Sequence, residues 1–459
     1  MAKYKAYPEY KDSGVEWLGE IPSHWKTISI SRLFSRTKRT GYTEKELLSV
    51  YRDYGVIPKS SRDDNNNKPS EDLSPYQLVE PNDLVMNKMK AWQGSIAISE
   101  YEGIVSPAYF VYKPNNVLFE LAHPRYVHYL LRNPIYVTQY LSRSKGIRVN
   151  QWDLDPDEFR NIELLLPDKT EQEKIYSFLD HETAKIDNLI EKQHQIIELL
   201  KEKRQAVISH AVTKGLNPDV PMKDSGVEWL GKVPTHWNVI RLKYLIKTFE
   251  QGWSPQCEAR LAEKDEYGVL KVGCVNSGDF DPFEHKALPS NLEPQKQYLI
   301  KKNDLLISRA NTKELVGSSA VVEKDYNNLI LCDKLYRLKF GKPVNPHFIS
   351  EFIRTPMVRK QIELSASGAS HSMQNIGQDT IKELFVALPP ESETQQLIAF
   401  IKNKINVFNS LIDLSQKQVS LLQERRTALI SAAVTGKIDV RDWVAPDTQD
   451  VEEPQEATA

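Results

Sequence analysis

Cysteine is scarce in this chain of 459 residues, which contains three, at Cys257, Cys274 and Cys332. They are too few and too widely spaced for a framework of disulfides or for a zinc site of the Cys-x-x-Cys type. We therefore expect reduced, partly buried thiols and predict that the chain holds no metal.

Long apolar runs are missing as well. No stretch approaches the roughly 20 apolar residues that span a bilayer. The first residues, MAKYKAYPEYKD, lack the apolar core of a secretion signal. These absences predict a cytoplasmic protein without a membrane partner.

The sequence also lacks a dominant charge and the common catalytic motifs. Its formal net charge is -2, so any binding of nucleic acid must come from local clusters of Lys and Arg. Neither a GxxxxGK[ST] phosphate loop nor an HExxH spacing occurs. We predict no catalytic residue, no cofactor bound by this chain and no enzymatic activity of its own.

What the sequence does contain is a long internal repeat. The phrase KDSGVEWLGEIPSHW at Lys11–Trp25 returns as KDSGVEWLGKVPTHW at Lys223–Trp237. Three further pairs of segments follow in the same order: PRYVHYLLRNPIYV with PHFISEFIRTPMV, LLLPDKTEQEKIYSFL with VALPPESETQQLIAFI, and KEKRQAVISHAVTKG with QERRTALISAAVTGK. Each half therefore carries a tryptophan-rich phrase, a variable body, a Leu-Pro strand end and a long terminal helix.

The long helices are predicted from periodicity. Apolar residues recur every three or four positions from Glu171 to about Val212, and again from Phe400 to Ala433. Heptad spacing is kept by Ile186, Leu200 and Val207 and by Phe408, Leu422 and Leu429. We predict that the two helices pair as a coiled coil, each a rod of roughly 60 Å for about 40 residues. The alternative is two separate amphipathic helices, each packed on its own domain.

Between these landmarks, short apolar runs punctuated by Gly, Pro and Asn are typical of strands and turns. Each body is followed by one predicted helix, near Arg125 to Leu141 and near His347 to Leu364. The predicted fold class is α+β, with two similar domains in pseudo-two-fold repeat separated by two long α-helices in an antiparallel coiled coil. The predicted boundaries are 1–166 for the first domain, 167–215 for the first long helix, 216–388 for the second domain, 389–440 for the second long helix and 441–459 for an acidic disordered tail.

Three doubled motifs carry a resemblance to a known family. The DSGVEWLG…PxHW phrase, the Leu-Pro…Glu-Gln opening of the long helix (Leu166, Pro167, Glu171, Gln172) and the helix end LLKEKRQAVISHAVTKG resemble the specificity subunit of type I restriction-modification enzymes. The resemblance covers essentially the whole chain in family order. One departure is Glu393-Thr394 in the second copy, where Glu-Gln is usual; we expect it to weaken a cap or a contact.

This resemblance implies a subunit whose two target-recognition domains each read one half of an asymmetric bipartite site in double-stranded DNA. It also implies docking of two methyltransferase subunits and, through them, of restriction subunits. S-adenosylmethionine, ATP and Mg would then belong to those partners. Two alternatives remain open on the residues alone: a coiled-coil scaffold with no DNA role, and an unrecognised DNA-modifying enzyme.

Candidate DNA contacts are segments that combine glycine, polar and basic residues at equivalent places in the two halves. Base edges are read by Arg, Lys, Asn and Gln, and phosphates are held by Lys and Arg. The candidates are Lys88, Lys90, Trp92, Gln93, Arg143, Lys145, Arg148, Asn150 and Gln151 in the first half, and Arg309, Asn311, Lys313, Ser370, His371, Gln374 and Asn375 in the second. RTKR, Arg36–Arg39, is a further candidate for phosphate contact. The alternative for each is a solvated loop.

The tryptophan-rich phrases are predicted to be structural. We expect Trp17, Trp25, Trp229 and Trp237 to anchor each body to the ends of the long helices, and His24 and His236 to form hydrogen bonds there. Surface positions on these phrases and on the long helices are candidates for the methyltransferase interface.

Overall fold

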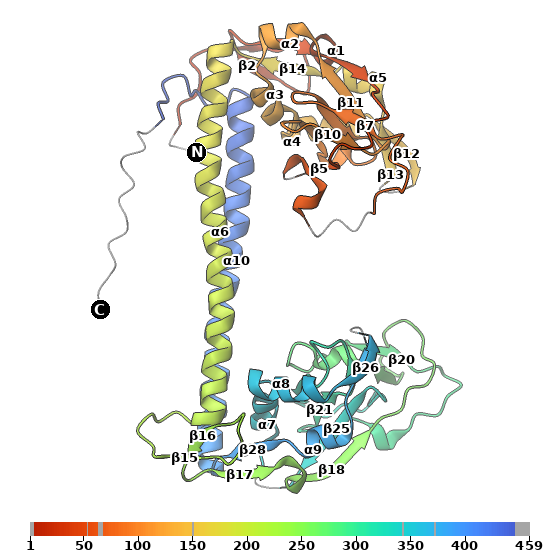
Figure 1. The fold of residues 1–459 in the computed structure, drawn as a ribbon, viewed down its shortest axis with the longest axis vertical. Coiled ribbons are helices and arrows are strands. Elements are labelled where there is room, and N and C mark those ends of the chain that lie inside the picture. The colour runs from red at the N-terminus through yellow and green to blue at the C-terminus, as the bar shows by residue number, and fades with distance from the viewer. Residues whose placement is uncertain are drawn as a thin grey trace. The chain divides into compact units, whose positions relative to one another are not determined.

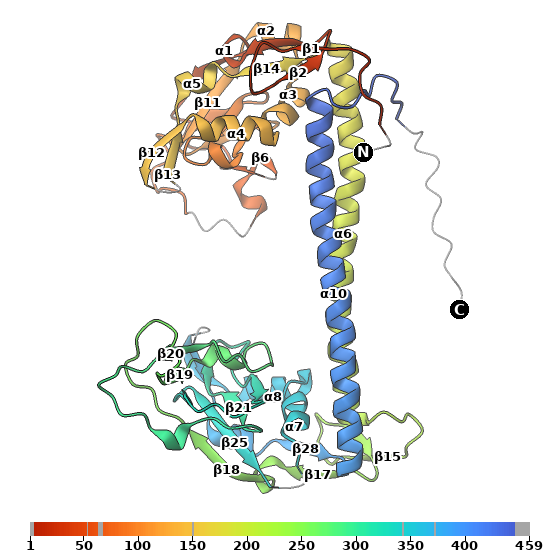
Figure 2. The same cartoon turned by 180° about the vertical axis from the view of Figure 1, so that it is seen from behind.

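The computed structural model describes residues 4–52, 54–62, 68–148, 151–341, 344–370 and 373–445. It divides into two compact units: unit 1 comprises Met1–His194 and Lys417–Ala459, and unit 2 comprises Gln195–Gln416. In each unit, a body of short strands and helices adjoins a section of two long helices, α6 (Lys169–Lys214) and α10 (Glu391–Val434) (Figure 1, Figure 2). The two units thus have the same make-up, as predicted, and each takes one of its two helix sections from each half of the repeat.

The body of unit 1 centres on a four-stranded antiparallel sheet in the order β4-β11-β8-β9. Its strands are β4 (Phe34–Thr37), β8 (Leu84–Asn87), β9 (Ile96–Ile98) and β11 (Tyr109–Pro114). Antiparallel pairs surround it: β1 (Tyr10–Asp12) with β2 (Glu20–Pro22), β3 (Lys26–Ser29) with β14 (Glu163–Leu166), β5 (Leu48–Tyr51) with β6 (Gly55–Pro58), β7 (Gln77–Val79) with β10 (Gly103–Val105), and β12 (Ser144–Arg148) with β13 (Gln151–Leu154). The short helices are α1 (Ile30–Leu33), α2 (Asn116–Leu121), α3 (Pro124–Leu131), α4 (Pro134–Ser142) and α5 (Pro156–Arg160), with 3-10 turns η1 (Lys59–Ser61) and η2 (Ala91–Gln93).

Unit 2 repeats this plan around the sheet β18-β25-β21-β23. Its strands are β18 (Ile246–Gln251), β21 (Leu305–Ser308), β23 (Ser319–Val321) and β25 (Leu335–Phe340). Around it lie β15 (Met222–Asp224) with β16 (Lys232–Pro234), β17 (Asn238–Arg241) with β28 (Phe385–Leu388), the sheet of β20 (His285–Ala287), β19 (Gly268–Leu270) and β24 (Leu329–Ile330), and the sheet of β22 (Ala310–Asn311), β27 (Met373–Asn375) and β26 (Ser367–Ser370). Helices are α7 (Pro346–Ile353), α8 (Pro356–Ser365) and α9 (Gln378–Lys382), with 3-10 turns η3 (Leu242–Tyr244), η4 (Val272–Val275) and η5 (Lys296–Tyr298).

The central sheet of each body is buried on both faces. In β8, Leu84 and Met86 point into the cluster that includes residues of the long helices, while Val85 points into a smaller cluster on the other face. This follows from the alternation of side chains along a strand. The equivalent strand β21 divides its side chains in the same way between two clusters of unit 2.

The single helix predicted after each body is wrong, because each is two helices. Pro134 starts α4 after α3, and Pro356 starts α8 after α7. Proline has no N–H to donate and its ring clashes with the preceding turn, so it is tolerated only in the first turn of a helix. The side chain of Asn133 caps the new helix by accepting a hydrogen bond from the N–H of Ile135 at 2.9 Å.

The long helices α6 and α10 run antiparallel, as predicted. In unit 1, Arg426 of α10 donates to Asp187 of α6 at 2.8 Å. In unit 2, Arg204 of α6 donates to Asn409 of α10 at 2.5 Å. These pairs occupy equivalent positions of the repeat, so one contact occurs twice with the roles of the two helices exchanged. No helix among the described residues is long and apolar enough to cross a membrane.

The segment after α10 packs on unit 1. The backbone N–H of Asp439 donates to the carbonyl of Lys5 at 2.7 Å, and the ring of Trp443 lies 5.6 Å from that of Phe178. Arg441 and Trp443, which the prediction counts in the tail, therefore contact the rest of unit 1, and residues 446–459 lie outside the described part of the chain. Cys274 and Cys332 are buried and Cys257 is half-buried, all as free thiols.

Candidate DNA interface

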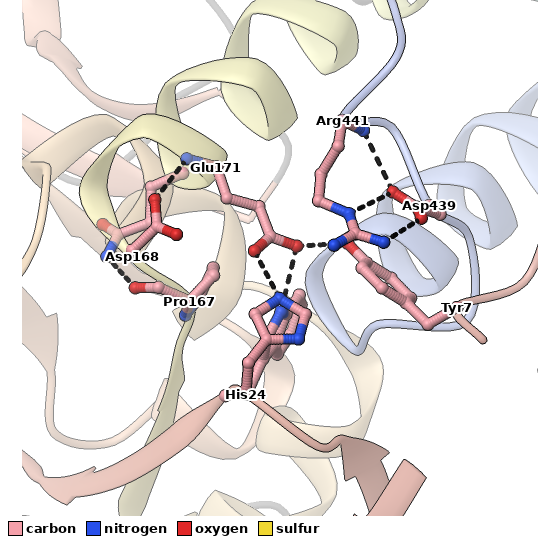
Figure 3. A network of polar contacts seen from close by, with 9 residues as sticks. Tyr7, His24, Pro167, Asp168, Glu171, Asp439 and Arg441 are labelled. Atoms are coloured by element: carbon pink, nitrogen blue, oxygen red, sulfur yellow. Dashed lines mark hydrogen bonds and ion pairs between the residues drawn. The ribbon is translucent and has the colours of Figure 1, made fainter. Parts of the chain in front are cut away.

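A buried carboxylate fastens the tryptophan-rich phrase of unit 1 to the first turn of α6 (Figure 3). Glu171, with 3% of its side chain exposed, accepts hydrogen bonds from the indole of Trp25 at 3.0 Å and the hydroxyl of Tyr7 at 2.6 Å. His24 Nε2 lies 2.7 Å from the second carboxylate oxygen. Burial, together with the hydrogen bond to Glu171, raises the pKa of Tyr7 and keeps its proton in this contact.

The segment after α10 completes this network. Arg441 pairs with Asp439 at 2.6 Å, and its guanidinium lies 5.1 Å from the ring of Tyr7 (Figure 3). Gly436 follows the helix with a φ of 71°, and a Cβ there would lie 2.4 Å from Pro22. Glycine is therefore required both by its left-handed backbone and by the close approach of the phrase.

Unit 2 repeats the anchor with fewer contacts. The indole of Trp237 donates to Glu393 at 3.1 Å, and His236 Nε2 lies 2.7 Å from the same oxygen. The Glu393 side chain is 25% exposed. No tyrosine in the described part of unit 2 donates to it, so the second anchor is looser than the first.

The Glu-Thr departure removes contacts, as expected. Gln172 donates to the carbonyls of Leu121 at 3.0 Å and Pro167 at 2.8 Å, and accepts from the N–H of His123 at 2.8 Å. Its counterpart Thr394 donates to the carbonyl of Pro390 at 3.0 Å. Gln172 thus joins α6 to the body through two hydrogen bonds, to Leu121 and His123, whereas the shorter Thr394 bonds at its own helix start.

The four tryptophans of the phrases pack within their units. Trp25 and Trp237 are fully buried. Trp17 and Trp229 are partly buried against the same clusters, and the ring of Trp17 lies 5.1 Å from that of Tyr136. These contacts place the four tryptophans in or against the hydrophobic cores that join each phrase to its unit.

The two candidate DNA-binding segments of unit 1 lie side by side. The N–H of Leu154 in β13 donates to the carbonyl of Lys88 at 3.2 Å. The rings of Trp92 and Trp152 meet edge to face with centroids 5.0 Å apart. Segments separated by about fifty positions in the sequence therefore form one surface, at the β12–β13 hairpin and η2.

Most candidate cations of this surface already have acidic or amide partners. Lys88 lies 3.7 Å from Asp153, and Lys145, which is 74% exposed, lies 3.6 Å from Asp155. Arg143 donates to the carbonyl of Gln139 at 3.3 Å. Lys90 and Gln93 are exposed. Asn150 lies outside the described residues, and Arg148 and Gln151 are described as strand backbone only.

The candidate segments of unit 2 pair directly as strands. In the sheet of β22, β27 and β26, Ala310 lies opposite Asn375 and Asn311 opposite Gln374. Arg309 donates its Nε–H to the carbonyl of Asp333 at 3.0 Å, and Lys313 is exposed. Ser370 is described as backbone of β26, and His371 lies outside the described residues.

The RTKR candidate is held within the body at both ends. The guanidinium of Arg36 lies 4.1 Å from the ring of Phe110, and Arg39 pairs with Glu80 and Asp83. These two arginines are therefore already engaged by their own domain.

Two residues of these surfaces were missed in the sequence. Trp152 adjoins a candidate segment, and its contact with Trp92 is visible only in three dimensions. Asn276 follows η4 and accepts a hydrogen bond from Asn311 at 2.9 Å. The one available signal is the polar turn NSGD, which marks an exposed turn but not its neighbour. In the described ranges, no group of three or more His, Cys, Asp or Glu is arranged to hold a metal ion.

Two α+β bodies joined through antiparallel helices, each presenting a loop-and-hairpin surface, define a class of protein built from a duplicated recognition domain. The model of the type I restriction modification DNA specificity domain matches residues 22–201 and 234–419. The chain belongs to this family, and its role is DNA sequence specificity without catalysis.

Relatives agree with this assignment. The chain is 22% identical to the type I restriction enzyme EcoKI specificity subunit of Escherichia coli K12, over 88% of this chain and 86% of that one. It is 27% identical to the EcoEI specificity subunit of Escherichia coli over 53% of this chain and 41% of the relative. One solved structure comes from work on the complex assembly and conformational transition of the type I R-M system. It has a TM-score of 0.66 at 15% identity and covers 91% of this chain and 99% of that one. The likeness to that structure shows the fold.

Proposed function

We propose that this subunit directs partner methyltransferases to an asymmetric bipartite site in double-stranded DNA, with the body of each unit reading one half. The observation that carries this proposal is the convergence of the candidate segments: in both units a loop after the central strand lies against a hairpin at the equivalent place in the repeat. A hairpin and an adjoining loop make a ribbon of a size that the major groove admits.

The two surfaces differ in chemistry, which supports unlike half-sites. At the equivalent hairpin position, unit 1 has Trp152 against Trp92, whereas unit 2 has Gln374 opposite Asn311. Aromatic side chains make apolar contacts such as those with a thymine methyl, while amides form hydrogen bonds with base edges. Two identical half-sites would not suit these two surfaces equally.

We infer that two copies of one methyltransferase subunit dock on the long helices. Unit 1 exposes Leu189 and Leu421 at 47% and 63%, and unit 2 exposes Leu411 and Leu199 at 42% and 64%. These leucines occupy equivalent positions of the repeat. Apolar side chains exposed at equivalent positions of the repeat fit contact with two copies of the same partner.

The remaining chemistry belongs to the partners in this proposal. Restriction subunits join through the methyltransferases, and S-adenosylmethionine, ATP and Mg are bound by those subunits. The absence of a GxxxxGK[ST] phosphate loop from the sequence favours the assignment of ATP to a partner and bears on that cofactor alone. The complex acts in the cytoplasm, where its DNA substrate is.

Methylation mapping tests the proposal. Host DNA is sequenced by a single-molecule method that detects methylated adenine, in cells that express the partner methyltransferase with and without this chain. A split motif methylated only when the chain is present is the expected result. If the assembled complex produces no motif that depends on the chain, the recognition role fails and a scaffold role is favoured.

A further inference from the structure

Three amide side chains from three separate segments of unit 2 gather beside the β26–β27 hairpin. Asn276 follows η4, Asn311 lies in β22 and Gln374 in β27. Asn311 and Gln374 are directly opposed across the two strands, so their side chains lie on the same face of the sheet. Asn276 is exposed and hydrogen-bonded to Asn311.

The backbone determines how these amides point. The backbone N–H of Thr312 can only donate, and it donates a hydrogen bond to Asn311 Oδ1 at 2.9 Å. Asn311 Nδ2 must then face Asn276, and it donates to Asn276 Oδ1 at 2.9 Å. Both polar atoms of Asn311 are thereby engaged within the protein.

These hydrogen bonds leave the amide of Asn276 able to bind a ligand through Nδ2 and through one lone pair of Oδ1. Its Nδ2 group is turned away from Asn311, and no hydrogen-bond partner for it occurs in the described part of the chain. Its Oδ1 has two lone pairs, of which Asn311 uses one. A donor and an acceptor are therefore presented side by side at an exposed position.

We propose that Asn276 reads an adenine in the half-site bound by unit 2, and that Asn311 is the residue that positions it. An asparagine amide matches the major-groove edge of adenine, donating from Nδ2 to N7 and accepting at Oδ1 from the N6 amino group. The inference rests on the proposed function and adds a specificity-determining residue to it.

At the hairpin position of unit 1 that corresponds to Gln374, the described side chain is Trp152, which packs against Trp92. The adenine contact is therefore assigned to the half-site bound by unit 2. Nearby cations suit the phosphates that flank such a base: Lys313 follows β22 and is exposed, and Lys334, also exposed, accepts at its carbonyl a hydrogen bond from the N–H of Arg309 at 2.8 Å.

The test is methylation mapping of variants of the full chain assembled with its methyltransferase. Asn276→Ala is expected to reduce discrimination at one adenine of one half-site by tenfold or more, with the other half-site unchanged. Asn311→Ala is expected to reduce it less at the same position, because Asn276 remains but is no longer oriented. Asn291→Ala, an exposed asparagine outside the three segments, is the matched control and is expected to leave the motif intact.

Asn276→Asp provides a second variant of nearly the same shape. It removes the Nδ2 donor, and its carboxylate favours the amino group of cytosine over adenine. An unchanged adenine preference in either Asn276 variant would overturn the proposal. So would loss of discrimination at both half-sites in an assembled Asn276→Ala complex, since a residue that reads one adenine affects one half-site. Absence of any motif with the unaltered chain contradicts the proposed function instead, which separates the two failures.

Discussion

Trp25 donates its indole N–H to the carboxylate of Glu171 at 3.0 Å, and the equivalent pair Trp237 and Glu393 repeats the contact at 3.1 Å. The two carboxylates differ in burial, with 3% and 25% of the side chain exposed. Tyr7 donates to Glu171 as well. The same motif therefore bears a larger share of stability in unit 1.

Glu171→Ala is expected to destabilise unit 1 by about 3 kcal/mol, because the buried donors of Trp25 and Tyr7 lose their acceptor. Glu393→Ala is expected to destabilise unit 2 by about 1 kcal/mol, since Glu393 is 25% exposed and water can replace it as the acceptor. Hydrogen exchange followed by mass spectrometry reports the opening of each unit separately. Equal losses of protection in the two units would contradict a larger role for Glu171. Tyr7→Phe removes one hydrogen bond, so its loss of stability should lie between those of Glu171→Ala and Glu393→Ala.

The stability of unit 1 is expected to fall at acid pH because of His128. Arg132 donates to its Nε2 at 2.9 Å, so Nδ1 carries the proton and donates to the carbonyl of Ile98 at 3.3 Å. Burial, and then the charge of Arg132, lower the pKa of His128 from 6.5 to about 3. A second proton therefore binds the unfolded chain more readily than the folded one.

Stability from this group is present above about pH 6.5 and is lost as pH falls toward 3, at up to about 1.4 kcal/mol per unit. The measurement is urea unfolding at pH 7 and pH 5 for the unaltered chain and for His128→Gln. The variant should lose less stability between the two pH values, by up to about 2 kcal/mol. An identical dependence on pH would show that His128 does not control it.

The exposed leucines are expected to control how many methyltransferase subunits bind. Changing Leu189 and Leu421 to Glu should weaken docking at unit 1 by about 100-fold or more, because a charge replaces apolar contact area, and leave one bound copy. The matching change of Leu199 and Leu411 should remove the other copy. Native mass spectrometry counts the subunits, and Gln418→Glu, which adds a charge at an exposed position of α10, is the control.

Two basic residues are expected to act differently on DNA binding. Lys145, being 74% exposed, is suited to a phosphate, so Lys145→Ala should reduce the dependence of log affinity on log salt by about one without lowering stability. Arg309 also supports the fold through Asp333, so Arg309→Ala should weaken binding and reduce stability by about 1 kcal/mol. Salt titrations of the assembled complex with duplex DNA, together with unfolding curves, make this comparison. A Lys145 variant with unchanged salt dependence would remove that residue from the interface.

The features predicted from sequence are those with local signals. Heptad apolar residues were sufficient to predict the long helices and their pairing, and the doubled phrase was sufficient to predict two similar bodies. The break between α3 and α4 was missed although Pro134 marks it, because the apolar period continues across the proline.

Contacts between distant segments had no such signal. Asp439, Arg441 and Tyr7 meet from opposite ends of the chain, and nothing in their spacing indicates it. The adjacency of Trp92 and Trp152, and of Asn276 and Asn311, depends on how strands pair within each body. The candidate segments could be predicted from the sequence. The residues that orient them, such as Trp152 and Asn276, could be identified only from the three-dimensional structure.

The strand pairs at the base of each body bear on how such proteins change over generations. Lys26 lies opposite Leu166, and Asn238 lies opposite Leu388, so each body enters and leaves its anchor at neighbouring residues. A gene segment that encodes one body can be exchanged for another whose ends meet in the same way, while the anchor and the helices are inherited unchanged. Under the proposed function, exchange of one body would change one half-site and leave the other as it was.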